Sequence, residues 1–176
     1  MRLALAPGSA DNRGMTTKPD KDKVYQSADF DKTPPRPRVV MPDKLIHRQV
    51  EGDGQRDGYS KERKHPVFFV DLPSKCISMT IGHLDPGQSS NRHRHTYETI
   101  LYVLEGEGYS VVHDQKIEWK TGDAVYIPVW TWHNHVNTSA NGIARYLACE
   151  NAPILQNLGG VALREELPEK GMKDPE

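Results

Sequence analysis

Two pairs of histidines, each with one residue between its members, are the side chains of this sequence best suited to chemistry. His93 and His95 lie in "NRHRHTYETILYVLEGEG", and His133 and His135 lie in "VWTWHNHVN". Side chains two residues apart on a strand point to one face, so each pair presents two imidazoles together, while Arg94 points to the opposite face. Imidazoles held together on an inward face are either costly buried polar groups or ligands of a metal ion.

Two or three short strands joined by tight turns separate the two histidine pairs in the sequence. Antiparallel neighbours fold back on each other, so we expect the second pair to return opposite the first. Three imidazoles from two strands could then converge on one cation.

The elements that must position these histidines are short strands. From about Val67 onward, β-branched or aromatic runs alternate with turn residues, and the runs are "VFFV", "CISMTI", "TILYVL", "YSVV", "KIEW", "AVYIP" and "ARYLAC". This texture predicts a sandwich or barrel. The one helix candidate is "NAPILQNLGG", with Asn151 as N-cap, Pro153 in the first turn and Gly159 as its stop.

The length of 176 residues is enough for about one domain. Residues 1–45 are polar and proline-rich without a helical or strand period, and they are interpreted as a flexible or partner-embracing N-terminal arm. Residues 46–165 are predicted to form the barrel domain, and residues 166–176 a flexible C-terminal tail.

Composition and charge exclude several classes of partner. The net charge of −1 provides no basic field for nucleic acid or an anionic membrane. No apolar run approaches the roughly 18 residues that span a bilayer. Cys76 and Cys149 lie singly in apolar runs, which favours buried thiols in a reducing compartment. The expected location is the cytoplasm, and the start of translation stays open between Met1 and Met15.

The pattern resembles the cupin superfamily, whose first motif reads G-x5-H-x-H-x3,4-E-x6-G and whose second reads G-x5-P-x-G-x2-H-x3-N. The matching residues are Gly87, His93, His95 and Gly106 for the first motif, and Gly122, Pro128, His133 and Asn137 for the second. The resemblance implies an all-β, cupin-type jelly-roll β-barrel, here with a short C-terminal helix and an irregular N-terminal arm. It also implies a homodimer.

Two departures from the motifs bear on the site. Trp130 stands at a glycine position of the second motif, and Thr99 stands where the family has its metal-binding glutamate. Glu98 is adjacent, but strand parity directs it away from the histidines unless a bulge intervenes. We therefore expect a three-histidine metal site made of His93, His95 and His133. Neutral ligands leave a divalent ion its full charge, and Fe(II) is favoured, with Mn, Zn, Ni, Co or Cu as alternatives.

The three-histidine set is similar to that of gentisate-type and diketone-cleaving dioxygenases. It implies a mononuclear non-haem Fe(II) dioxygenase whose small-molecule substrate, an aromatic acid or a dicarbonyl, chelates the metal. His135 is the predicted catalytic residue and would take the substrate proton, although a fourth ligand or a structural role is also open to it. The predicted substrate-binding residues are Tyr97, Trp130, Trp132 and Arg145. The alternatives are a non-redox metal-dependent isomerase, lyase or decarboxylase, and a ligand-binding cupin without catalysis.

Overall fold

The computed structural model describes residues 39–53 and 57–167. The chain divides into two compact units, Met1–Val40 and Met41–Glu176, and every helix and strand described here belongs to the second. The predicted N-terminal arm falls mostly outside the described residues, and the predicted C-terminal tail almost entirely so. The predicted domain boundaries therefore stay predictions.

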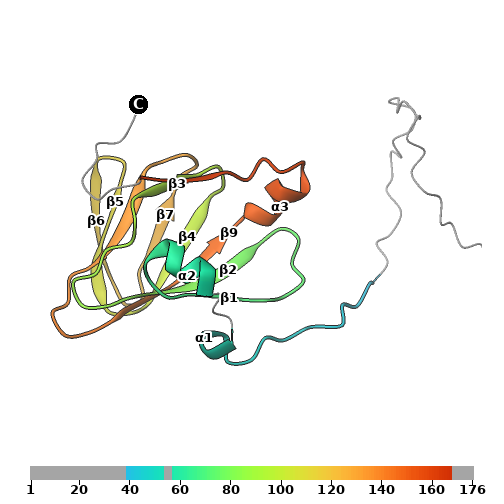
Figure 1. Ribbon diagram of the computed structural model, residues 1–176, viewed down its shortest axis with the longest axis horizontal. Helices are drawn as coiled ribbons and strands as arrows, with labels where there is room; N and C mark the ends of the chain where they lie inside the picture. Colours follow the sequence, from blue (N-terminus) through green and yellow to red (C-terminus); the bar gives the residue numbers. More distant parts are fainter. Residues whose placement is uncertain (1–38, 54–56, 168–176) are drawn as a thin grey trace, which may run out of the picture. The chain divides into compact units, whose positions relative to one another are not determined.

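Ten strands and three short helices make up the described part of the chain (Figure 1). The helices are α1 (Val50–Asp53), α2 (Asp57–Arg63) and α3 (Ala152–Asn157). The first five strands are β1 (Val67–Phe69), β2 (Ser78–Leu84), β3 (His93–His95), β4 (Thr99–Glu105) and β5 (Glu107–Val112). The remaining strands are β6 (Gln115–Lys120), β7 (Ala124–Ile127), β8 (His133–Asn137), β9 (Ala144–Glu150) and β10 (Arg164–Glu166).

The strands form two five-stranded antiparallel sheets that enclose the core. One sheet has the order β1-β2-β9-β4-β7 and the other β10-β3-β8-β5-β6. Buried and exposed side chains alternate along β4 and β9, as expected for strands with one face on the core. The predicted all-β, jelly-roll class is confirmed, with two facing sheets rather than one fully closed barrel.

The apolar core lies between the two sheets. It is formed by inward side chains from both sheets, namely Leu84, Leu101, Val103, Val112, Trp119, Val125, Ile127, Ala144 and Tyr146. The inward histidines of β3 and β8 are buried in the same interior as this core.

Sequence reasoning located the apolar strands and missed the polar ones. Every apolar run named above overlaps a strand, whereas β10 reads "REE" and carries no alternation signal. The predicted helix is confirmed as α3, and Asn151 occupies its N-cap position without a side-chain capping bond. The Asn151 amide instead bonds to Glu98, accepting from its backbone N–H and donating to its carboxylate. The short helices α1 and α2 were not predicted.

The prediction that both cysteines are buried was wrong. Cys76 is exposed and Cys149 is half-buried, and both are free thiols. Cys76 lies just before β2, outside the sheet, so strand parity does not turn it inward. Among the described residues, every helix is too short and too polar to cross a membrane.

Candidate metal centre

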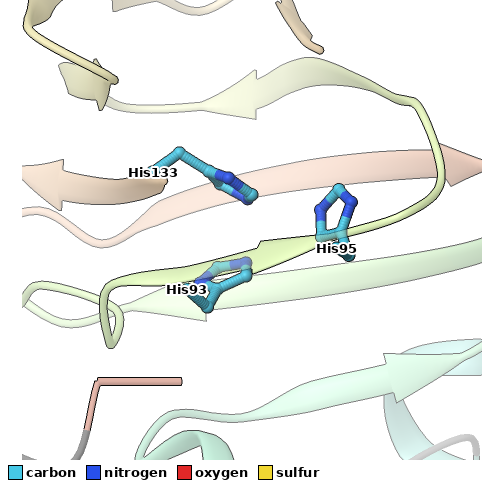
Figure 2. Close-up of side chains that lie close together, drawn as sticks. All are labelled: His93, His95 and His133. Atoms are coloured by element: carbon cyan, nitrogen blue, oxygen red, sulfur yellow. The ribbon is translucent and has the colours of Figure 1, made fainter. Parts of the chain in front are cut away.

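Three imidazoles from two neighbouring strands meet inside the molecule. His93 and His95 extend from the same face of β3, and His133 begins β8 directly opposite His93 in the strand register. One ring nitrogen from each histidine lies within 4.8 Å of the other two, and all three side chains are buried. Figure 2 shows the three rings turned toward a common space between the strands.

Backbone carbonyls fix the orientation of all three rings. The Nδ1 atoms of His93, His95 and His133 lie 2.8, 2.7 and 2.8 Å from carbonyl oxygens of residues two positions away. A carbonyl only accepts, so each Nδ1 carries the hydrogen and each Nε2 keeps a lone pair. Ligands of metal sites are commonly held in this way, through their second ring nitrogen.

Burial keeps these imidazoles in the neutral form that a metal requires. Desolvation lowers the pKa of His93 and His133 well below the usual value, with further lowering by neighbouring histidines. Desolvation also lowers the pKa of His95, to about 4. Three neutral nitrogen donors in a closed space fit a divalent transition-metal ion, and they leave coordination positions for a ligand.

His135 lines the same pocket but has a different hydrogen-bonding pattern. Its Nδ1 lies 2.8 Å from the hydroxyl of Ser110, which also accepts a hydrogen bond of 2.9 Å from Trp119 Nε1. Ser110 is fully buried, and His135 Nδ1 is the acceptor for its hydroxyl hydrogen among the described residues. The hydrogen of the neutral His135 ring is therefore on Nε2, and burial lowers the pKa of this ring to about 3.

This pattern bears on the predicted role of His135. A ring with hydrogen on Nε2 donates through that atom, so the hydrogen bonds favour a donor over the predicted acceptor of a substrate proton. His135 also lies outside the group of three ring nitrogens that approach one another within 4.8 Å.

The neighbouring strand brings a carboxyl group to the pocket, outside the three-histidine group. Thr99 is buried, and Glu98 is exposed and accepts a hydrogen bond from the Tyr126 hydroxyl, as strand parity predicts. Glu150 on β9 is paired with Thr99 in the register, so both side chains point to the pocket that they line. Burial raises the pKa of the Glu150 carboxyl. Sequence reasoning missed Glu150 because it follows an apolar run and has no motif position.

Two segments outside the motifs cover the pocket. Tyr59 and Arg63 reach it from α2, and Arg164 reaches it from β10. The pocket volume is about 50 Å³. That is well below the roughly 300–1,000 Å³ of pockets for drug-sized ligands, so it has room for a small ligand only.

Tyr97 and Arg145 lie at very different distances from the histidines. The Tyr97 ring stacks on the His95 ring, with centroids 4.0 Å apart and planes within 1°, so it supports a predicted ligand. Arg145 lies on the face of β9 opposite Tyr146 and bonds to Glu51 and Glu105. The structure thus does not bring Arg145 to the histidine pocket, because strand parity turns it outward.

Trp130 and Trp132 line a separate cleft on the other side of β3. Arg94 lies between their rings, at 4.3 and 4.6 Å from the ring centroids, and bonds to Glu165. The cleft has a volume of about 740 Å³ and does not include the histidines. Trp130 has a φ of 59°, in the left-handed region, which accounts for the glycine that the second motif has at this position.

Comparison with known proteins connects the site to a family. Residues 80–149 match the model of the cupin domain. An uncharacterized protein of Methanocaldococcus jannaschii is 37% identical over 94 residues, which are 53% of this chain and 72% of that protein. A 5-aminosalicylate 1,2-dioxygenase of Comamonas sp is 33% identical over 76 residues, which are 43% of this chain and 20% of the dioxygenase.

A solved structure has the same fold. Salicylate 1,2-dioxygenase from Pseudoaminobacter salicylatoxidans, solved as an adduct with gentisate, superimposes with a TM-score of 0.54 at 22% identity. The match covers 68% of this chain and 34% of that enzyme. The chain thus spans 20% and 34% of the length of these two dioxygenases. Neither Arg63 nor Arg164 lies within the residues that match the cupin domain.

Proposed function

The chain belongs to the cupin superfamily, and on that premise we propose that it is a mononuclear non-haem Fe(II) dioxygenase. Its substrate would be a small oxygenated molecule, an aromatic acid or a dicarbonyl, that chelates the metal. The observation that carries the proposal is the convergence of three buried Nε2 lone pairs, each ring anchored through its Nδ1. The likeness to ring-cleaving dioxygenases supports the redox reaction.

The chemistry divides between the ion and the side chains around it. A divalent ion held by three neutral imidazoles would act as a Lewis acid and would bring substrate and dioxygen together. His93, His95 and His133 fix the position of that ion, and Tyr97 holds the His95 ring in place by stacking. With its hydrogen on Nε2, His135 would donate a hydrogen bond to a ligand oxygen in the pocket.

Metal analysis and oxygen consumption test the proposal together. We expect near-stoichiometric iron in protein produced with iron in minimal medium, and loss of that iron in a His93→Ala, His133→Ala double variant. The matched control is His113→Asn, because His113 is exposed and asparagine tolerates its φ of 55°. An oxygen electrode then screens the iron-loaded protein with catechols, gentisate-like acids and diketones. Absence of oxygen uptake with the whole panel contradicts the dioxygenase.

A second candidate keeps the metal without the redox step. The described pocket places no carboxylate within the three-histidine group, so a bound ion retains its double charge and polarises a carbonyl strongly. This observation favours an isomerase, lyase or decarboxylase. Turnover by the Zn(II) or Mn(II) form under anaerobic conditions identifies this candidate, and ligand binding without any product identifies a non-catalytic cupin.

Two features of the whole protein complete the proposal, a homodimer and a cytoplasmic location. Light scattering of the full chain after gel filtration measures the first, and fractionation of the producing cells measures the second.

A further inference from the structure

Two arginine side chains lie in the wall of the histidine pocket and have no role in holding a metal. Arg63 is the last residue of α2, and Arg164 is the first residue of β10. They are the cationic side chains in the pocket lining. The strand of Arg164, β10, pairs with β3, and the helix of Arg63, α2, contacts β1.

Arg63 lies largely out of solvent, and its Nε has no hydrogen-bond acceptor. Its side chain is 11% exposed, and its nearest carboxylate oxygen, Glu166 Oε1, lies 3.6 Å from Nε, too far for a hydrogen bond. The guanidinium lies over the Tyr59 ring, 4.0 Å from the ring centroid. This contact gives Nε no hydrogen-bond acceptor. Within the described part of the chain, Nε of Arg63 is one of three buried side-chain polar atoms without a partner. A buried charged donor without an acceptor is costly, so the pocket lacks an acceptor here.

Glu166 lies near both guanidinium groups but hydrogen-bonds to Arg164 alone. Arg164 donates from Nε and Nη2 to Glu166 Oε1, at 3.2 and 2.9 Å. The other oxygen of Glu166 accepts a 2.9 Å hydrogen bond from Asn91 Nδ2. Both oxygens are therefore engaged, and none is aligned with Arg63.

The acid in the pocket lining does not neutralise both arginine charges. Glu150 is the carboxyl group in the pocket lining, which does not include Glu166, and burial raises the pKa of Glu150. The lining thus holds two guanidinium groups and one carboxyl group, so it has an excess of positive charge. A metal ion with neutral ligands adds more positive charge, so the missing partner is an anion.

We propose that Arg63 and Arg164 form a carboxylate-binding subsite of the metal pocket, and that the ligand is a small 2-oxo or 2-hydroxy acid. The carboxylate contacts the guanidinium groups, and the adjacent oxygen reaches the ion held by the histidines. The volume of about 50 Å³ accommodates a short acid better than an aromatic one. This substrate class rests on the proposed metal site but not on the redox reaction.

Calorimetric titration of the metal-loaded full-length protein with pyruvate and with lactate tests the subsite. Loss of a charge-assisted hydrogen bond in Arg63→Met should weaken acid binding by about tenfold to a hundredfold. Metal content should stay unchanged in this variant. The control is Arg48→Met, the same change at an exposed arginine, which should bind the acids as the unmodified protein does.

Two further measurements do not depend on how well Arg63→Met folds. Pyruvamide, which lacks the carboxylate, should bind the unmodified protein at least tenfold more weakly than pyruvate. Glu166→Gln removes the carboxylate that competes for the guanidinium groups, so it should strengthen acid binding severalfold.

The outcomes separate this inference from the proposed function. Equal affinity of Arg63→Met and unmodified protein for pyruvate overturns the subsite, as does equal affinity for pyruvate and pyruvamide. Tighter binding of gentisate than of either small acid overturns the size assignment. If the protein holds no metal, the proposed function fails, whereas Arg63-dependent binding of pyruvate to the metal-free protein still supports the subsite.

Discussion

At the scale of single residues, hydrogen-bond partners decide which histidine does what. Four inward imidazoles lie in one pocket, and sequence treats His133 and His135 alike because they share strand parity. Three rings donate from Nδ1 to carbonyls, whereas His135 accepts from the Ser110 hydroxyl. This difference in hydrogen-bond direction leaves three rings with a lone pair on Nε2 and one ring with a donor there.

Trp130 offers a residue-scale prediction about backbone strain. Its positive φ favours glycine, so Trp130→Gly should be more stable than Trp130→Ala by about 1 kcal/mol. Both variants lose the same stacking on Arg94, and their difference therefore isolates the backbone. Urea unfolding of the two proteins measures it. If Trp130→Ala is the more stable of the pair, the left-handed conformation at this position is not strained.

At the scale of elements, close packing between β2 and β9 holds the floor of the pocket. Gly82 on β2 faces Tyr146 on β9, and the Tyr146 ring occupies the space where a Cβ of residue 82 would be. The ring then lies under His135, with centroids 5.4 Å apart. The absence of a side chain at Gly82 thus allows the Tyr146 ring to pack against the histidine pocket.

The element-scale prediction concerns this contact. Gly82→Ala should lower the free energy of unfolding by about 1–3 kcal/mol, because the new methyl group overlaps the Tyr146 ring. In a Tyr146→Ala background the same substitution should cost much less, and a double-mutant cycle by urea unfolding measures the coupling. Gly58→Ala is the control, since nothing lies within 4 Å of its Cβ position. Equal costs in both backgrounds would contradict the proposed contact.

At the scale of the whole molecule, the pocket concentrates buried histidines in the interior between the sheets. Desolvation lowers the pKa of five histidines, His65, His93, His95, His133 and His135. The unfolded chain binds protons on these groups near the usual pKa of about 6.5, while the folded protein binds them only at lower pH. Acid therefore favours the unfolded state of the metal-free protein.

The expected pH dependence follows from that sign. Stability should be highest above about pH 6.5 and fall as the pH drops toward 4. At pH 5 each histidine with a folded pKa of about 4 or lower contributes a loss of roughly 2 kcal/mol. Urea unfolding of chelator-treated protein between pH 8 and pH 5 measures the loss, and His65→Gln should show a smaller one. A stability that is flat over this range contradicts the neutral, buried state of the histidines.

The sequence by itself determined the fold class and the three imidazoles that meet. Both depend on local periods: alternation along apolar runs such as "TILYVL" predicts strands, and the spacing of His93 and His95 puts them on one face. It also directed Glu98 away from the histidines. These features are encoded within a few residues of each other, so they can be read without knowing how distant segments pack.

Only the tertiary structure decided what surrounds those imidazoles. Arg63 and Arg164 come from short polar elements with no periodic signal, and Glu150 reaches the pocket through its pairing with Thr99 across two strands. Arg145, by contrast, was predicted to bind substrate and lies on the outer face of β9. Long-range packing and strand register place the charged side chains in the pocket. The residue spacing within a single segment predicts neither of them.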